Sequence, residues 1–404
     1  MIKTTSVHAV SSIAASESAK SLCSPISILC TVIFISCSGG LYAQELNGYA
    51  SDMPSVIYMK QNQSNTWWQN SLHNRLNFSW RFAKNISIET GMRNRLLAGS
   101  GDMLDPAEMN ADKGWADLTW NIFSADRNAN RLLLNTSFDR LHVTFEKDKW
   151  QIRLGRQRIN WGQTLVWNPN DIFNTYSFFD FDYPERPGCD ALRSTYYHSE
   201  TASSELAVSV NHAGKTTAAL LHHWNWRNFD YQIIAGEQTE SDVILGGAWT
   251  GDFGGLNFRG EFSYFHPIGS FADTAGTVAV SVGVDCMLSG SLMLQAEALY
   301  NNSGNSSEGL TALYSAPLSA KKLSVCDWNV FAQVARPVTP RLNLALSGMY
   351  FVDVNSFYAG LTLDYSLVEN LDMSFIAQYF ATAENSAVGN MRFIMGFVRL
   401  KYSF

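Results

Sequence analysis

Along most of the chain, hydrophobic and polar residues alternate one position at a time. The final seven residues, Val398–Phe404, have Val, Leu, Tyr and Phe at the even positions and Arg, Lys and Ser at the odd ones. Successive side chains of a β-strand point to opposite faces of its sheet. This spacing therefore predicts a strand with one apolar face and one polar face.

The alternation returns from Gln69 onwards, with short polar turns between many of the segments. No stretch has a helical period, a heptad repeat or the composition of a domain linker. Counting the candidate strands gives about 16 to 18, and bacterial barrels favour even numbers. Trp and Tyr residues near the strand ends are typical of aromatic girdles at membrane interfaces. The clearest segments are 72–82, 86–95, 140–146, 256–264, 292–300 and 371–379.

These segments predict an all-β fold, a single antiparallel up-and-down barrel that spans a membrane with apolar side chains outward. The composition agrees, because charged residues make up 16%, below the roughly one quarter that is typical of soluble domains. After the N-terminal region, no stretch reaches the ~18 uninterrupted apolar residues of a spanning helix. The formal charge of −7 argues against nucleic-acid binding, which requires a basic surface.

The N-terminal region has the features of an export signal. Lysines precede an apolar core at Ile26–Ile35, small residues follow it, and we expect cleavage after Ala43. We therefore divide the chain into a signal peptide at residues 1–43, a periplasmic lead-in at residues 44–68 and an outer-membrane barrel at residues 69–404.

Neither catalytic nor cofactor chemistry is indicated. The three cysteines that follow the signal peptide are an odd number, and their spacing is not that of a metal site. His222 and His223 are adjacent on a predicted strand, so they point to opposite faces and cannot share one metal ion. No P-loop, dinucleotide-binding glycine pattern or nucleophile elbow occurs. We expect no enzyme activity, no cofactor and no metal.

Residues 150–193 carry the most distinctive sequence. A predicted strand at residues 150–158 leads into a loop, residues 160–190, that is too long for a simple hairpin. The alternation would turn Arg156 and Arg158 toward hydrocarbon, at a cost of about 2–4 kcal/mol each near the midplane. Either the strand leaves the membrane at Gly155, or a β-bulge there returns both side chains to the interior. We favour the bulge.

The aromatic, acidic character of this loop predicts that it folds into the barrel and narrows it. Its acidic groups would face arginines of the inner wall, and the opposed charges would set a transverse field that selects polar solutes. The alternative is a structural cap in which loop and wall only form stabilising ion pairs. The candidate residues are Arg75, Arg93, Arg95, Arg140, Arg153, Arg156 and Arg158 on the wall, and Asp171, Asp180, Asp182, Glu185, Arg186 and Asp190 in the loop.

Two parts of the chain resemble known outer-membrane proteins. The last strand, with Tyr402 and Phe404, resembles the closing strand of Gram-negative barrels, whose terminal Phe is part of the signal read by the barrel-assembly machinery. Four motifs in the distinctive block are Leu-Gly-Arg-Gln at 154–157, Trp-Gly at 161–162, Asn-Pro-Asn-Asp-Ile-Phe-Asn at 168–174 and Glu-Arg-Pro-Gly at 185–188. Together they resemble a widespread, mostly uncharacterised family of porin-like barrels, which implies a channel without fixing a solute.

The leading hypothesis is a passive channel for small hydrophilic solutes in the outer membrane of a Gram-negative bacterium. Arginine-rich early strands favour anions, although the negative total charge and the acidic loop weaken this preference. The alternatives are a barrel plugged by the loop, serving as adhesin, receptor or scaffold, and a transporter of hydrophobic solutes, suggested by the loop phenylalanines. Expected partners are outer-membrane lipid, the barrel-assembly machinery and small polar solutes; a monomer and a trimer are both left open.

Overall fold

The computed structural model describes residues 44–60, 64–100, 114–125, 130–179, 185–269, 271, 273–304, 318–382 and 391–404. The predicted signal peptide with its cleavage after Ala43 lies outside these residues, as do Asp180 and Asp182. The described strands are β1 (Gln44–Lys60), β2 (Ser64–Ala83), β3 (Ile86–Ser100), β4 (Thr119–Ala125), β5 (Asn130–Lys147), β6 (Trp150–Gln157), β7 (Cys189–Tyr197), β8 (Ala202–Val210), β9 (Thr216–Trp226), β10 (Phe229–Gln238), β11 (Asp242–Phe253), β12 (Leu256–Pro267), β13 (Thr277–Leu288), β14 (Leu292–Asn301), β15 (Trp328–Thr339), β16 (Leu342–Phe351), β17 (Ser356–Val368), β18 (Leu371–Thr382) and β19 (Arg392–Ser403).

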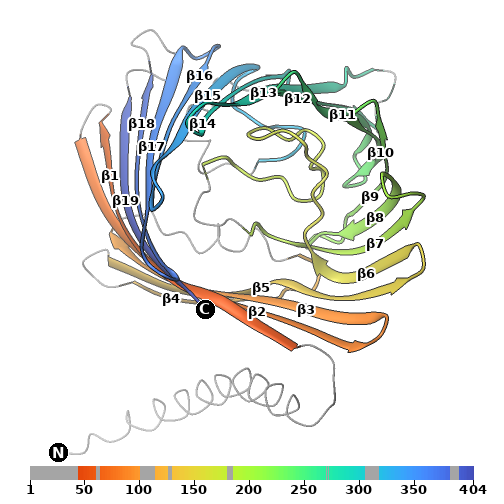
Figure 1. Cartoon of the computed structure of the whole chain (residues 1–404), viewed down its shortest axis with the longest axis horizontal. Coiled ribbons are helices and arrows are strands. Elements are labelled where there is room, and N and C mark those ends of the chain that lie inside the picture. The colour runs from red at the N-terminus through yellow and green to blue at the C-terminus, as the bar shows by residue number, and fades with distance from the viewer. Residues whose placement is uncertain are drawn as a thin grey trace, which may run out of the picture. The chain divides into compact units, whose positions relative to one another are not determined.

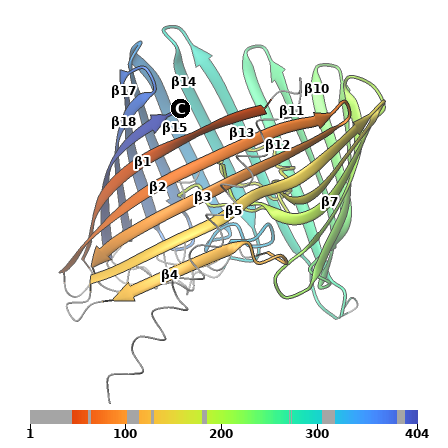
Figure 2. The ribbon, with the colours of Figure 1, turned by 90° about the horizontal axis from the view of Figure 1, so that it is seen from below.

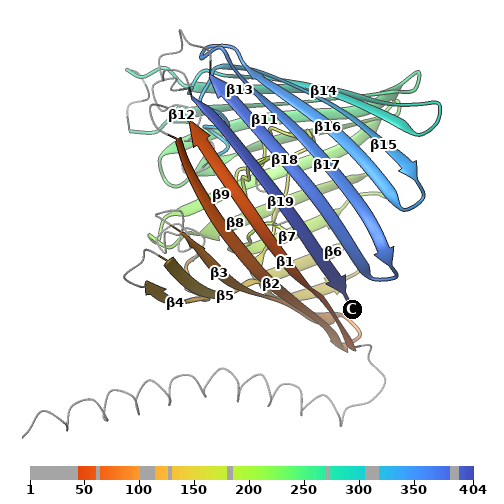
Figure 3. The ribbon, with the colours of Figure 1, turned by 90° about the vertical axis from the view of Figure 1, so that its left-hand side faces the viewer.

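Eighteen of these strands form one closed antiparallel barrel (Figure 1). Neighbours along the chain pair with each other, and β1 pairs with β19 to close the ring (Figure 3). The exception is β4, because β3 pairs directly with β5. β4 pairs with the first part of β5 (Figure 2) and β6 with the last part, so β4 continues the line of β6 beyond Gln157. The architecture confirms the predicted all-β barrel and its strand number.

The closing strand β19 has the two faces that its sequence predicts. Val398 and Leu400 are exposed on the outer surface of the barrel. On the inner face, the Lys401 ammonium lies 4.2 Å from the ring centre of Tyr49, which belongs to β1. Phe404 and Gly48 exchange backbone hydrogen bonds of 2.9 Å in both directions, which ties the end of the chain to β1. In the part of the chain that the structure describes, no helix is long and apolar enough to cross a bilayer.

The predicted periplasmic lead-in at residues 44–68 is wrong, because residues 44–60 form β1 and residues 64–68 form the start of β2. The outward positions of β1 include Ala50, Asp52 and Pro54, so the alternation that marks the other strands is missing from the sequence. The strand lacks a continuous apolar outer face, and backbone hydrogen bonds to β2 on one side and β19 on the other hold it in the sheet. The β1–β19 pairing is interrupted beside Pro54, which has no N–H to donate.

The predicted bulge is displaced from β6 to β5. β6 keeps an unbroken register with β5 and β7, and Gly155 instead takes a φ of +119°, which favours glycine. The register of β3 with β5 shifts between Gly91 and Met92, where β5 accommodates Asp139 as an extra residue. Asp139 and Arg140 consequently both face the interior.

Candidate functional site

The chain between β6 and β7 runs inside the ring of strands (Figure 1). We call its described parts, residues 158–179 and 185–188, the lumen segment. Its contacts are with inward side chains of strands that lie far apart around the ring, among them β1, β5, β8, β12 and β14. The segment is therefore part of the barrel interior.

Three buried glutamates of the inner wall hold the lumen segment: Glu205 on β8, Glu261 on β12 and Glu297 on β14. The indole N–H of Trp161 donates to Glu205 over 2.6 Å. Because Glu205 also accepts from Arg193, the anchor at β8 is a charge-balanced pair.

Glu261 and Glu297 bind the backbone of the lumen segment. Glu261 accepts the N–H groups of residues 163, 164 and 170, and the Thr164 hydroxyl at 2.8 Å. Glu297 accepts three consecutive N–H groups, those of residues 165–167, at 2.8 to 3.2 Å, and the Ser281 hydroxyl at 2.9 Å. A carboxylate in a low-dielectric interior needs such donors to remain charged. The two glutamates thus supply acceptors for backbone groups that would otherwise be buried without partners.

Apolar contacts fix the same segment on the other side of the ring. Val166, Trp167 and Phe179 belong to one buried cluster with inward residues of β15–β19 and β1, and with Leu323 and Val325 from the chain between β14 and β15. A cavity of only about 10 Å³ lies among these side chains, which is about the smallest space that holds one water molecule. Around this cavity the inward side chains of β15–β19 are therefore apolar and close-packed.

The phenylalanines that suggested a hydrophobic-solute transporter serve in this packing. Phe178 and Phe179 lie edge-on to the rings of Phe331 and Tyr358, with centroids 5.0 and 5.1 Å apart, and Phe173 lies edge-on to Trp161 at 5.0 Å. Phe181 lies outside the described residues.

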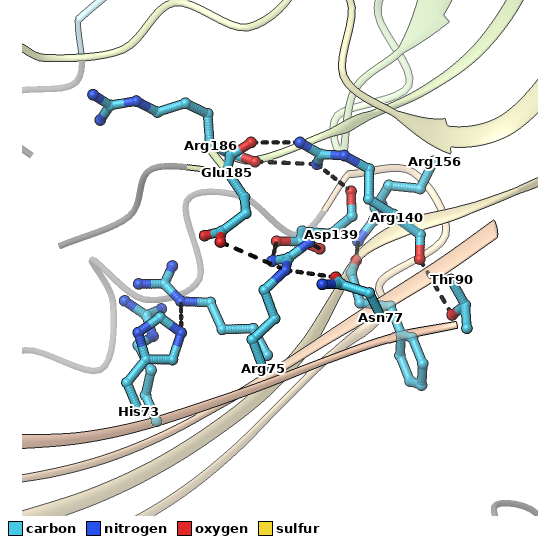
Figure 4. A network of polar contacts seen from close by, with 12 residues as sticks. His73, Arg75, Asn77, Thr90, Asp139, Arg140, Arg156, Glu185 and Arg186 are labelled. Atoms are coloured by element: carbon cyan, nitrogen blue, oxygen red, sulfur yellow. Dashed lines mark hydrogen bonds and ion pairs between the residues drawn. The ribbon is translucent and has the colours of Figure 1, made fainter. Parts of the chain in front are cut away.

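The end of the lumen segment meets a cluster of arginines on β2 and β5 (Figure 4). Arg75 forms a two-bond ion pair with Asp139, and its Nε lies 3.9 Å from Glu185. The Tyr49 hydroxyl donates to Glu185 over 3.0 Å. Arg140 donates to the backbone carbonyls of Glu185 and Arg186. The structure thus brings four candidates together, Arg75, Arg140, Glu185 and Arg186.

Two further candidates on β3 extend this cationic surface along the inner wall. Arg93 Nε lies 3.1 Å from His73 Nε2, and Arg95 donates to the side-chain oxygen Oδ1 of Asn135 at 2.9 and 3.2 Å. The inner wall of β2, β3 and β5 is therefore rich in guanidinium groups, while the cluster around Phe179 on β15–β19 is apolar.

Two further wall candidates, Arg153 and Arg156, lie on β6, and Arg156 borders this cluster (Figure 4), where it donates to the Phe138 carbonyl over 3.2 Å. Arg156 pairs with Asp190 through bonds of 2.7 and 2.8 Å, and Asp190 also accepts the N–H of Ala116, just before β4. This ion pair occupies the junction at which β4 takes over the line of β6. Arg153 donates to Thr144 over 3.3 Å, within the wall. Arg156 and Asp190 therefore join parts of the wall.

Arg158 and Asp171 lie within the lumen segment, around Tyr176. The guanidinium carbons of Arg158 and Arg186 lie 5.6 and 4.1 Å from the centre of the Tyr176 ring. Asp171 is 1% exposed. Burial raises the pKa of Asp171 well above its usual value, and the charge of Arg158 opposes that rise.

Sequence reasoning missed the glutamate anchors because it looked for arginines opposite an acidic loop. These glutamates could have been recognised as inward carboxylates that have no cationic side chain opposite them on the neighbouring strands. Glu261 pairs with Ala248 and Ser281, and Glu297 with Gly283 and Phe331. Such a carboxylate must find donors elsewhere in the fold.

Within the described residues, no group of three His, Cys, Asp or Glu side chains is suited to a metal ion. On the outer surface, His198 and His222 lie 2.8 and 3.0 Å from the Ser204 hydroxyl. Neither histidine pairs with a carboxylate in the described part of the chain, so the arrangement lacks the acid of a Ser–His–acid triad.

Comparisons with known proteins identify the fold. No protein-family model matches the sequence, and a search of curated proteins finds no match. Among solved structures, Acinetobacter baumannii OccAB1 is 9% identical with a TM-score of 0.54, over 89% of this chain and 97% of that one. Pseudomonas aeruginosa OccK7 (OpdD) is 7% identical, with a TM-score of 0.54 over 89% and 99%.

A third similar structure is Pseudomonas aeruginosa OccK9 (OpdG), 8% identical with a TM-score of 0.54, over 89% of this chain and 99% of that one. At such low identities the likeness shows a common fold and carries no residue-level assignment. The structural neighbours are outer-membrane porins of the Occ/OprD type, and this chain has their barrel fold.

Proposed function

We propose that this protein is a porin-like channel of a Gram-negative outer membrane, which passes small hydrophilic solutes through a lumen narrowed by residues 158–188. The observation that carries the proposal is the anchoring of the lumen segment inside the barrel by Glu205, Glu261 and Glu297. A segment held by buried carboxylates narrows a pore at a fixed place and keeps its own polar groups satisfied. The porin-type fold of the structural neighbours supports the same function.

We further propose a preference for anionic solutes. Among the described residues, guanidinium groups outnumber carboxylates where the segment meets the wall of β2, β3 and β5, and clefts lined by one sign of charge concentrate ions of the opposite sign. The apolar cluster of β15–β19 lies elsewhere on the ring, so this guanidinium surface lines only one side of the lumen. The groups concerned are Arg75, Arg93, Arg95 and Arg140 against Asp139 and Glu185.

Planar-bilayer recording of the purified protein tests the channel. We expect discrete current steps in symmetric salt and, in a salt gradient, a reversal potential of the sign that anion selectivity gives. The protein's heat-dependent gel mobility shows whether it is folded. If folded protein inserted in the bilayer passes no current, the channel is refuted. A reversal potential of the opposite sign would refute the anion preference alone.

A plugged barrel is the second candidate, because the lumen segment contacts β8, β12, β14 and the apolar wall of β15–β19 together. Deleting residues 159–187 separates the two candidates. A channel conducts before the deletion and passes a larger current after it. A plugged barrel conducts only after it.

A further inference from the structure

A small group of polar side chains lies on the outer surface of the barrel, on β7, β8 and β9. Ser204 on β8 pairs in register with Tyr196 on β7 and His222 on β9. Tyr196 in turn pairs with Trp150 on β6, which is 49% exposed on the outside. Cross-strand partners share a face of the sheet, so the group faces away from the lumen. We call His198, Ser204 and His222, with Lys149 beside them, the rim cluster.

The rim cluster lies at the end of the barrel where short turns join the strands. The turns next to it are residues 148–149, 198–201 and 227–228. Outer-membrane barrels have their short turns on the periplasmic side. Aromatic rings flank the cluster on both sides, Trp150 with Tyr196 at 4.8 Å between ring centres and Trp224 with Tyr231 at 5.7 Å. Such rings mark the level of the lipid headgroups, so the cluster is at the headgroup level of the periplasmic leaflet.

The next outward positions toward the middle of the bilayer are apolar. Leu206 on β8 and Leu220 on β9 pair in register and are 47% and 51% exposed. A molecule bound at the rim cluster therefore meets an apolar surface on one side and the water around the turns on the other. A lipid, with acyl chains below a polar headgroup, has this division.

The rim cluster has more hydrogen-bond donors than its own contacts use. The Ser204 hydroxyl lies 2.8 Å from His198 Nε2 and 3.0 Å from His222 Nδ1. A hydroxyl has one hydrogen, so with both rings neutral one ring accepts it and the other donates to the Ser204 oxygen. The accepting ring then has its N–H on its other nitrogen, which has no hydrogen-bond partner among the described residues. The Lys149 ammonium donates to the His198 backbone carbonyl over 3.0 Å and has two further N–H groups.

Surplus donors beside a positive charge are suited to an anion with several acceptor oxygens. Lysine is a common partner of phosphate, and hydrogen bonds to an ionised acceptor are stronger than neutral ones. Glu200, in the turn that follows His198, is exposed, so water and salt screen its repulsion of an anion. A metal ion is disfavoured, because the Lys149 ammonium lies beside His198 and neither imidazole is joined by a carboxylate in the described part of the chain.

We propose that the rim cluster binds the phosphate group of a phospholipid in the periplasmic leaflet of the outer membrane. The Lys149 ammonium and the free imidazole N–H donate to phosphate oxygens, and the acyl chains lie over the apolar positions of β8 and β9. Basic side chains at a membrane surface also attract anionic lipids, so we expect phosphatidylglycerol to bind. The site rests on the proposed membrane location, and it does not depend on conduction.

Native mass spectrometry of delipidated protein in an uncharged maltoside detergent tests the proposal. Phosphatidylglycerol is titrated in, and the fraction of protein that retains one lipid gives the affinity. Lys149→Gln with His198→Phe and His222→Phe removes the charge and both imidazoles, and should bind the first lipid about tenfold more weakly than wild type. Arg341→Gln, which removes an exposed cation from another short turn of the same rim, is the control and should bind as wild type does. Equal affinities of wild type and triple variant, or an equal loss in Arg341→Gln, would overturn the proposal.

Two competitors identify the ligand group. Diacylglycerol, which lacks the phosphate, should not displace phosphatidylglycerol from wild type, and displacement by it would refute phosphate recognition. Inorganic phosphate at millimolar concentration should not displace the lipid either, because it has no acyl chains. Displacement by inorganic phosphate would assign the site to a free anion and overturn the lipid.

Lys149→Gln alone keeps the test valid if the triple variant does not fold. Lys149 lies in an exposed turn, so this variant should keep the heat-dependent gel mobility of wild type and still bind the first lipid several-fold more weakly. An unchanged affinity in Lys149→Gln would contradict the proposal. Failure of the protein to fractionate with outer membranes would instead refute the membrane location on which both the channel and the lipid site rest.

Discussion

Replacing Glu297 by glutamine removes a charge that three consecutive N–H groups of the lumen segment share. These groups belong to Leu165, Val166 and Trp167 and lie 2.8 to 3.2 Å from the carboxylate oxygens. A hydrogen bond to a charged group contributes about 1.5–3 kcal/mol, and an unpaired buried donor costs a similar amount. Glutamine keeps one acceptor oxygen but directs an NH2 group toward the donors. We therefore expect Glu297→Gln to lower the free energy that holds the lumen segment against β14 by about 2–4 kcal/mol.

Hydrogen exchange of the backbone amides measures this opening directly. A loss of 2–4 kcal/mol corresponds to exchange roughly 30- to 900-fold faster at Trp167, since about 1.36 kcal/mol is a factor of ten. Amides of β14 and β15 should stay protected, because the wall pairings remain. Glu369→Gln, at an exposed turn, is the matched control and should leave exchange unchanged. Wild-type protection at Trp167 in Glu297→Gln, or equal loss throughout the barrel, would refute the anchoring role.

Three other expectations follow from the same structure. Gly155→Ala places a side chain on a backbone with a φ of +119° and against the Leu141 carbonyl, and should lower the free energy of unfolding by about 1–3 kcal/mol. Gly396→Ala, the control, meets open space and should cost no more than about 1 kcal/mol. Equal losses in the two variants would contradict this reasoning. Because burial raises the pKa of Asp171, the folded protein keeps a proton that the unfolded chain releases. The free energy of unfolding should therefore fall as pH rises above about 4, until the pKa of the folded state is reached. Asp171→Asn should remove this pH dependence from denaturation curves, and an unchanged pH dependence would exclude Asp171 as its source. Arg93→Gln with Arg95→Gln should move the reversal potential toward cation permeation, and an unchanged potential would separate these residues from selectivity.

The sequence predicts strands well where one face is apolar and the other polar. β12 and the end of β19, residues 398–403, are of this kind, because their outward residues are mostly apolar and their inward ones mostly polar. β1 was missed because Asp52 and Pro54 interrupt its outward face, and the hydrogen bonds that hold it come from strands far away in the chain. β4 was missed as well, since its place depends on β6 ending at Gln157.

The site was harder to predict than the fold, because strand periodicity shows on which face of the sheet a side chain lies but not which group it contacts. The expectation of an acidic loop against an arginine wall describes Glu185 with Arg75, at 3.9 Å. Elsewhere the charges are reversed, with wall carboxylates such as Glu261 accepting backbone N–H groups of the segment. Backbone donors look alike in every sequence, so their partners are visible only in the fold.

Alternating exposure along the closing strand is the claim on which both the barrel and its lumen depend. Single cysteines at positions 398 to 401, in a protein otherwise free of cysteine, can be tested with a membrane-impermeant maleimide. We expect cysteines in place of Arg399 and Lys401 to react from the water-filled interior, and those in place of Val398 and Leu400 to be protected by lipid. Uniform labelling of all four positions, or protection of the two cationic positions alone, would contradict the account.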